Sequence, residues 1–148
     1  MSIQISSSRQ RGFTLLEIMV VIVILGVLAS LVIPSLMGNK DRADRQKAVS
    51  DLIALENALD MYKLDNGRYP TTEQGLSALV NAPAIEPLAR HYRREGYIRR
   101  LPQDPWGNAY HLVSPGKFSA LDIFSAGPDG EAGTEDDVTN WQLTDSGK

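Results

Sequence analysis

The most prominent feature of the hydropathy pattern is an almost unbroken apolar run over residues 13–37. As a helix it is roughly 37 Å long at ~1.5 Å per residue, enough to cross the ~30 Å hydrocarbon layer of a bilayer. The pattern then becomes amphipathic. A 4-3-4-3 spacing predicts that the helix continues with one apolar face, formed by Ala48, Leu52, Leu55, Leu59 and Tyr62. Asp65, Asn66 and Gly67 end the helix after about residue 64, because glycine suits a C-terminal cap.

Pro34 interrupts the hydrogen bonding of the apolar run, since it has no N–H to donate to the carbonyl of Ser30. A bend or a local loosening is therefore expected between residues 30 and 34. Membrane helices also tolerate proline without such a role. The pattern leaves both interpretations open.

Beyond the helix, short elements alternate with turns. A loop region over residues 65–108 contains a short helix from Thr72, its predicted cap, to about Val80. The final region, residues 109–148, predicts strands at 109–113, 118–124 and 138–143. Three short strands on one long helix predict an α+β fold, in which the second half of the helix packs on a small antiparallel sheet.

Composition narrows the function. With 148 residues there is room for one domain beyond the helix, and the absence of cysteine excludes disulfides, thiolate nucleophiles and Cys-ligated zinc. The formal net charge is −3, and it becomes −5 without Arg9 and Arg11, which argues against a nucleic-acid surface. The two histidines, His91 and His111, lack a flanking nucleophile pattern, so no enzyme is predicted.

The basic segment between Arg90 and Arg100 is the exception to this acidity, and it is interleaved with Tyr92 and Tyr97. Such a pattern is compatible with RNA or anionic lipid, with a solvated face, or with contact to an acidic patch on a neighbouring subunit. Overall acidity disfavours nucleic acid.

The N-terminus differs from a secretory signal. A basic leader, residues 1–12, ends at Gly12, the only small-residue cleavage site, and the apolar run starts after it at Phe13. Cleavage there would leave the helix on the mature chain. Glu17 lies inside the run, where a charge at the bilayer centre costs ~2.5–3.5 kcal/mol. The new α-amine of Phe13 would be largely protonated and is a natural partner for it.

The stretch GFTLLE, residues 12–17, resembles the class III signal of type IV pilins and type II secretion pseudopilins. The resemblance implies that a prepilin peptidase cuts after Gly12 and N-methylates Phe13. It also implies that Glu17 is an assembly residue that pairs with the Phe13 amine of a neighbouring subunit. The alternative is a plain N-terminal anchor helix that tolerates Glu17.

Three further stretches extend the likeness over nearly the whole chain: NGRYPTTEQGLSAL at 66–79, DPWGN at 104–108 and DIFSAG at 122–127. They resemble the major pseudopilins of bacterial type II secretion systems. Type IV pilins usually carry a C-terminal cysteine pair, which this chain lacks.

The resemblance implies a non-enzymatic subunit that spans the inner membrane once through residues 13–37 and places residues 38–148 in the periplasm. It would polymerise into a pseudopilus that drives export of folded proteins across the outer membrane. Expected partners are other copies of the chain, prepilin peptidase, minor pseudopilins and the inner-membrane assembly platform. Alternatives are a minor pseudopilin, a type IV pilin, or an anchored periplasmic binding module or enzyme.

The last candidate site is the acidic loop, residues 126–138, which holds five carboxylates between residues 129 and 137. Its spacing does not match an EF-hand, so the residues alone fit either a solvated turn or a calcium site. The resemblance implies one Ca²⁺ held by the side chains of Asp129, Asp136 and Asp137 and by the carbonyls of Ala126 and Val138. It leaves Glu131 and Glu135 outside the inner ligands.

Overall fold

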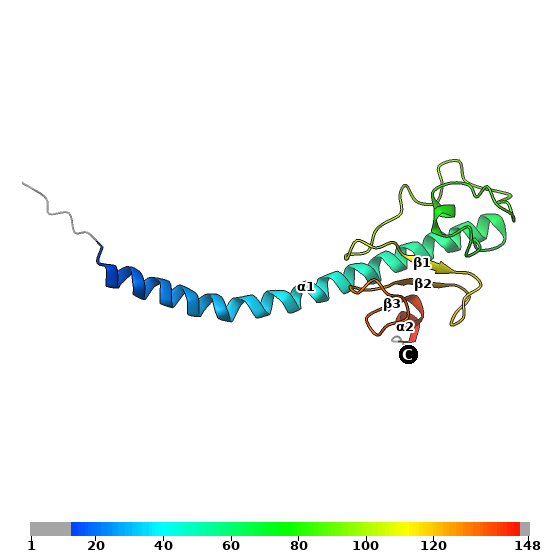
Figure 1. The fold of residues 1–148 in the computed structure, drawn as a ribbon. Coiled ribbons are helices and arrows are strands. Elements are labelled where there is room, and N and C mark those ends of the chain that lie inside the picture. The colour runs from blue at the N-terminus through cyan, green and yellow to red at the C-terminus, as the bar shows by residue number, and fades with distance from the viewer. Residues whose placement is uncertain (1–12, 146–148) are drawn as a thin grey trace, which may run out of the picture. The chain divides into compact units, whose positions relative to one another are not determined.

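The computed structural model describes residues 13–145; within this range the side chains of residues 31–37, 144 and 145 are not described. The chain divides into two compact units, Met1–Lys40 and Asp41–Lys148. The first contains the start of a long helix. The second contains the rest of that helix, a three-stranded sheet and the connecting loops (Figure 1).

The long helix α1 runs from Leu15 to Asn66 without an assigned break. It ends where the sequence predicts, because Gly67 adopts a φ of 77° and its N–H donates to the carbonyl of Lys63 at 2.7 Å. The bend expected near Pro34 lies in a segment, residues 31–37, whose side chains the structure does not describe, and it stays a prediction.

Among the described residues, no helix combines the length and the apolarity that a membrane crossing requires. The predicted span, residues 13–37, includes 31–37, whose side chains lie outside the description. The predicted boundaries of leader, span and periplasmic domain therefore stay predictions.

The core of the second unit forms where the amphipathic half of α1 meets the sheet (Figure 1). Every residue of the predicted apolar face is buried, with Leu52, Leu59 and Tyr62 completely inaccessible. The sheet contributes Leu112, Ile123 and Val138 to the same cluster. The predicted α+β fold with a long helix on a small antiparallel sheet is confirmed.

The sheet has the order β1-β2-β3 and both pairings are antiparallel. Its strands are β1 (His111–Val113), β2 (Asp122–Ser125) and β3 (Val138–Thr139). Leu112 pairs with Ile123, and Ser125 pairs with Val138. The first predicted strand is therefore shortened to 111–113, and Ala109 forms only an isolated bridge to Gln103.

The second predicted strand, 118–124, is wrong at its start. The buried carboxylate of Asp122 accepts hydrogen bonds from the backbone N–H groups of Lys117 at 2.6 Å, Phe118 at 3.1 Å and Ser119 at 3.0 Å. These bonds hold residues 117–119 in a turn, so strand pairing begins only at Asp122.

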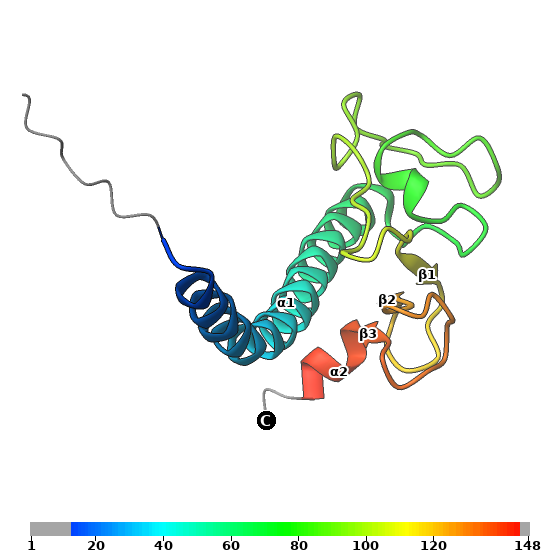
Figure 2. The same ribbon diagram turned by 60° about the vertical axis from the view of Figure 1, so that its left-hand side comes forward.

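The third predicted strand, 138–143, is also wrong after its second residue, because the chain continues as helix α2 (Asn140–Asp145) (Figure 2). The Asn140 side chain takes the place of further strand pairing. Its Oδ1 accepts from the backbone N–H of Ile123 at 2.9 Å, and its Nδ2 donates to the carbonyl of Leu121 at 3.2 Å. With the edge of β2 satisfied in this way, the backbone is free to turn into a helix.

The short helix predicted from Thr72 is the 3₁₀ helix η1 (Leu76–Leu79), and its N-cap is Gly75 without a side-chain hydrogen bond. The cap prediction for Thr72 is wrong, because its Oγ1 accepts from the backbone N–H of Ser114 at 2.9 Å. Thr71 and Gln74 instead bond reciprocally, each backbone N–H donating to the other's side chain.

Candidate functional site

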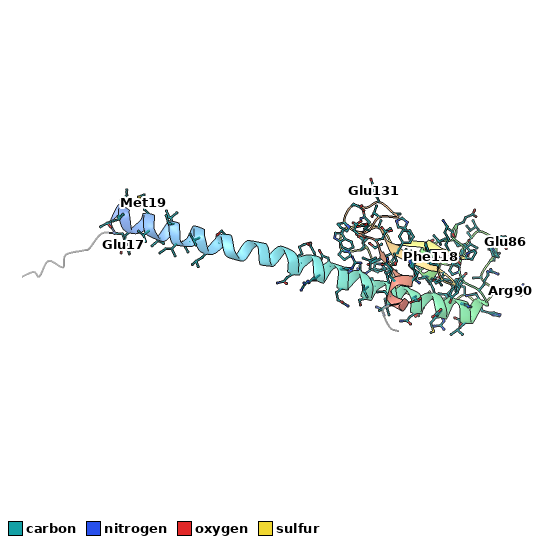
Figure 3. All side chains as sticks on the ribbon, turned by 90° about the horizontal axis from the view of Figure 1, so that it is seen from below. Glu17, Met19, Glu86, Arg90, Phe118 and Glu131 are labelled. Atoms are coloured by element: carbon teal, nitrogen blue, oxygen red, sulfur yellow. The ribbon has the colours of Figure 1, made fainter. Side chains whose placement is uncertain are left out.

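The first group of candidate residues lies at the start of α1. Gly12 is outside the described residues, whereas Phe13 is 80% exposed and Glu17 is also exposed. Figure 3 labels Glu17 in the first turns of the helix. The positive end of the helix dipole favours a carboxylate in this turn.

Thr14 is a residue that the sequence reasoning missed. Its Oγ1 accepts a 3.2 Å hydrogen bond from the backbone N–H of Glu17, so Thr14 caps the helix. The signal was present, because Thr14 and Glu17 have the spacing of a capping box. Glu17 thus stands at a defined position in the first turn, three residues after the cap.

The second group lies on the acidic loop between β2 and β3, drawn in orange in Figure 2. Gly127, the second residue of the loop, has a φ of 66°, and a Cβ there would lie 2.6 Å from Oδ2 of Asp136. The backbone N–H of Asp129 donates to the same oxygen at 3.3 Å. The fold therefore brings together Asp129 and Asp136, seven positions apart in the sequence.

Hydrogen bonds from within the loop already engage these two carboxylates. Thr134 Oγ1 donates to Asp136, and this bond, together with that from the Asp129 N–H, lowers the pKa of Asp136 despite some desolvation. Asp129 Oδ1 accepts from the backbone N–H of Glu131 at 2.9 Å.

Asp137 differs from its neighbours in being buried. It is 8% exposed, and its Oδ2 accepts from the backbone N–H of Gly133 at 2.8 Å. Its Oδ1 is buried and has no hydrogen-bond partner among the described residues. A buried carboxylate oxygen left unpaired costs free energy, so this oxygen is available to a cation or to a hydrogen-bond donor.

The acidic side chains do not converge as they stand. Within the described residues, no three His, Cys, Asp or Glu side chains form a group that would hold a metal ion. Glu131 and Glu135 are exposed, and Figure 3 shows Glu131 projecting away from the loop. Ala126 and Val138, whose backbone carbonyls are the other predicted ligands, are buried at the two ends of the loop.

A buried relay that the sequence reasoning also missed supports the start of the loop. Asp104 is 4% exposed and Ser125 is fully buried, and Ser125 Oγ donates to Asp104 Oδ2 at 2.6 Å. The backbone N–H of Gly127 in turn donates to Ser125 Oγ at 3.2 Å. The DPWGN turn marks Asp104 as a turn residue, but nothing in the sequence indicates its distant partner Ser125.

The basic segment is partly accounted for by internal contacts. Arg93 Nε lies 2.5 Å from Asp65 Oδ2, which lowers the pKa of Asp65. Tyr92 and Tyr97 pack with Tyr62 of α1, with ring centroids 5.2 to 6.3 Å apart. The aromatic side chains of this segment therefore serve packing rather than base stacking.

Comparison with known proteins decides the family. Residues 35–141 match the family described as type II secretion system (T2SS), protein G, and residues 7–33 match the prokaryotic N-terminal methylation motif. The chain belongs to the type II secretion system protein G family. The second match covers Gly12, Phe13 and Glu17, although cleavage, methylation and pairing at these residues stay predictions.

Individual relatives support the same family assignment. The type II secretion system core protein G of Escherichia coli K12 is 71% identical over 139 residues, covering 94% of this chain and 96% of the relative. That of Pseudomonas aeruginosa is 49% identical over 136 residues, covering 90% and 96%.

Comparison with a solved structure supports the fold as well as the family. The crystal structure of the major pseudopilin from the type 2 secretion system of enterohaemorrhagic E. coli matches with a TM-score of 0.70 and 68% identity, covering 73% of this chain and 91% of that one. The predicted resemblance to major pseudopilins is confirmed over the minor pseudopilin and type IV pilin alternatives.

Proposed function

We propose that the chain is a structural, non-enzymatic subunit that polymerises from the inner membrane into a type II secretion pseudopilus, driving export of folded proteins. One observation carries this proposal. Every described side chain from Phe13 to Ser30 is exposed, although nearly all are apolar. A helix that is apolar on all faces requires a lipid or protein environment. The membrane supplies lipid before assembly, and other copies of the helix supply protein in the filament.

The N-terminal residues are consistent with a subunit that lies first in the membrane and later in the filament. Prepilin peptidase would cut after Gly12 and methylate Phe13, which leaves a cationic amine four residues before Glu17. In the filament this amine of one subunit would neutralise Glu17 of another, because an unpaired charge among apolar helices is costly. Minor pseudopilins and the inner-membrane assembly platform would be the remaining partners, with residues 38–148 in the periplasm.

Complementation tests this function. A bacterium that lacks its own major pseudopilin is given the full chain, and secretion of a folded exoprotein and filament formation are followed together. We expect both to be restored, and intact mass from membranes to start at N-methylated Phe13. A mature protein that retains residues 1–12, or restored secretion without any filament, would contradict the proposal.

We further propose that the acidic loop holds one Ca²⁺. Asp129, Asp136 and Asp137 would supply side-chain oxygens, and Ala126 and Val138 would supply carbonyls. The support is chemical: calcium prefers six to eight hard oxygen ligands, and Asp137 Oδ1 is buried without a partner among the described residues.

Binding would require the loop to exchange internal hydrogen bonds for ligand bonds. Asp129 and Asp136 now accept backbone and hydroxyl hydrogens from the loop itself. These carboxylates would supply negatively charged oxygens to a bound Ca²⁺, and the carbonyls of Ala126 and Val138 would contribute from the two ends of the loop.

A further inference from the structure

Asp104 is a buried carboxylate whose hydrogen bonds all come from backbone and hydroxyl groups. Its Oδ1 accepts from the backbone N–H groups of Trp106 at 3.1 Å and Asn108 at 2.7 Å, and its Oδ2 accepts from Ser125 Oγ. Within the part of the chain that the structure describes, it forms no ion pair with a lysine or arginine. Three hydrogen bonds satisfy the carboxylate instead, two from the DPWGN turn and one from Ser125 of β2, so Asp104 joins the turn to the strand that precedes the acidic loop.

The hydrogen bonds lead from Asp104 to the acidic loop. Ser125 Oγ, which donates to Asp104, accepts the backbone N–H of Gly127, and Asn108 Nδ2 donates to the carbonyl of Gly127 at 3.4 Å. Asn108 of the DPWGN turn thus holds the Gly127 carbonyl directly, whereas the Gly127 N–H is held by Ser125 of β2, whose hydroxyl is bonded to Asp104. Gly127 directly follows Ala126, and its Cα faces Asp136 so closely that a Cβ would lie 2.6 Å from the carboxylate.

We infer that Asp104 is a positioning residue for the acidic loop: through Ser125, and with Asn108, it fixes the Gly127 backbone between the Ala126 carbonyl and the Asp136 side chain. The inference rests on the proposed calcium site and concerns residues that were not predicted to touch the ion. By holding the backbone beside the Ala126 carbonyl in place before the ion arrives, the relay would reduce the ordering cost that binding otherwise carries.

Two variants break the relay while keeping the turn. Ser125→Ala removes the hydroxyl and leaves the Gly127 N–H and Asp104 Oδ2 without their partner. Asp104→Asn keeps an oxygen for the two backbone N–H groups, but its amide NH₂ faces Ser125 as a donor instead of an acceptor. Ser77→Ala is the control, because it removes an exposed serine hydroxyl that donates to the carbonyl of Gln74, remote from the loop.

The test is calorimetric titration of the full chain in detergent with calcium chloride. Loss of both buried hydrogen bonds of Ser125 predicts a dissociation constant about tenfold higher for Ser125→Ala, and the weaker disturbance in Asp104→Asn predicts a several-fold increase. Ser77→Ala should bind as the wild type does. Melting curves without calcium, recorded beside the titration, reveal any loss of stability that is independent of the ion.

The outcomes separate the two proposals. If the wild type binds no calcium, the calcium site itself is wrong. If the wild type binds and both relay variants bind equally well, the relay is only structural and this inference is overturned, whatever happens to the calcium-free melting point. Should Ser125→Ala not fold, Asn108→Ala decides, because Asn108 is partly exposed and its backbone N–H to Asp104 is retained.

Discussion

The phenol of Tyr110 donates a 2.8 Å hydrogen bond to Oδ2 of Asp51 on α1. The same carboxylate oxygen lies 2.5 Å from Nζ of Lys47, so one atom joins the helix to the segment just before β1. Burial, and secondarily the Asp51 carboxylate, raises the pKa of Tyr110, which keeps the phenol protonated as a donor. The contact therefore fastens the sheet to the helix beside the apolar core.

Tyr110→Phe should lower the free energy of unfolding by about 1 kcal/mol, the net worth of one hydrogen bond. Asp51 retains Lys47, which limits the loss. Tyr69→Phe is the control, because Tyr69 makes a similar 2.7 Å bond to Asp60 of the same helix at an exposed position. Melting by circular dichroism should show the smaller change for Tyr69→Phe, and the reverse order would contradict the assignment.

Two glycines of the acidic loop both have positive φ angles, but only one lies in close contact with Asp136. Substituting each by alanine therefore distinguishes a steric clash from backbone strain. Gly127 and Gly130 have φ angles of 66° and 71°, so alanine at either position should cost about 1–2 kcal/mol. A Cβ at Gly127 would lie 2.6 Å from Asp136, whereas at Gly130 the nearest atom is 3.6 Å away in Asn108. We expect Gly127→Ala to lower the melting point further than Gly130→Ala. Equal losses would show that the contact with Asp136 relaxes without cost.

The turn before β2 should give the protein an acid sensitivity. Burial would raise the pKa of Asp122, but the N–H groups of Lys117, Phe118 and Ser119 outweigh it and hold the pKa below its usual value. A lowered folded pKa contributes stability above the unfolded value of about 3.9, and this stability is lost as pH falls below it.

Asp122→Asn should accordingly be less stable than the wild type at about pH 7, because its amide cannot accept all three N–H groups, with a cost of about 1–3 kcal/mol. The difference should shrink as pH falls through about 4 toward 3, since the unfolded wild type then binds a proton that the folded Asp122 carboxylate, with its lowered pKa, does not. Unfolding midpoints across this range measure it. A constant difference at all pH values would contradict the role given to the carboxylate.

The sequence pattern correctly predicted the elements that are determined by interactions between residues close together in the chain. The 4-3-4-3 spacing located the buried face of α1, and Gly67 located its end. The strand predictions failed where side chains bond to distant backbone: Asp122 holds a turn, and Asn140 replaces strand pairing at Ile123. The Asp104–Ser125 contact joins residues 21 positions apart, and no periodicity reports it.

Glu17 offers a direct test of assembly. Glu17→Ala should insert into the membrane at least as well as the wild type, since it removes a charge from an apolar helix, but filament yield should fall sharply. Glu131→Ala, which removes an exposed carboxylate from the second unit, is the control and should assemble normally. The measurement is filament yield by electron microscopy beside membrane content. Normal filaments from Glu17→Ala would rule out the pairing of Glu17 with the Phe13 amine.

Calcium itself gives the last prediction. An ion that binds only the folded chain stabilises it by about 2.7 kcal/mol at a concentration of about 100 Kd, so calcium should raise the wild-type melting point by several degrees. Magnesium should replace it poorly, because it demands tight octahedral geometry and releases water reluctantly. Asp137→Asn should abolish the response.

Without calcium, the stability of Asp137→Asn relative to the wild type distinguishes loss of an ion ligand from general destabilisation. Asp137→Asn removes a buried carboxylate charge whose Oδ1 has no partner among the described residues. Without calcium, the variant should therefore be as stable as the wild type or more so, and only the gain on adding calcium should disappear. Glu135→Gln, an exposed neighbour, should keep the full response. A wild type whose melting point ignores calcium would leave the acidic loop as a solvated turn, and Asp137 would then need a different donor for its buried oxygen.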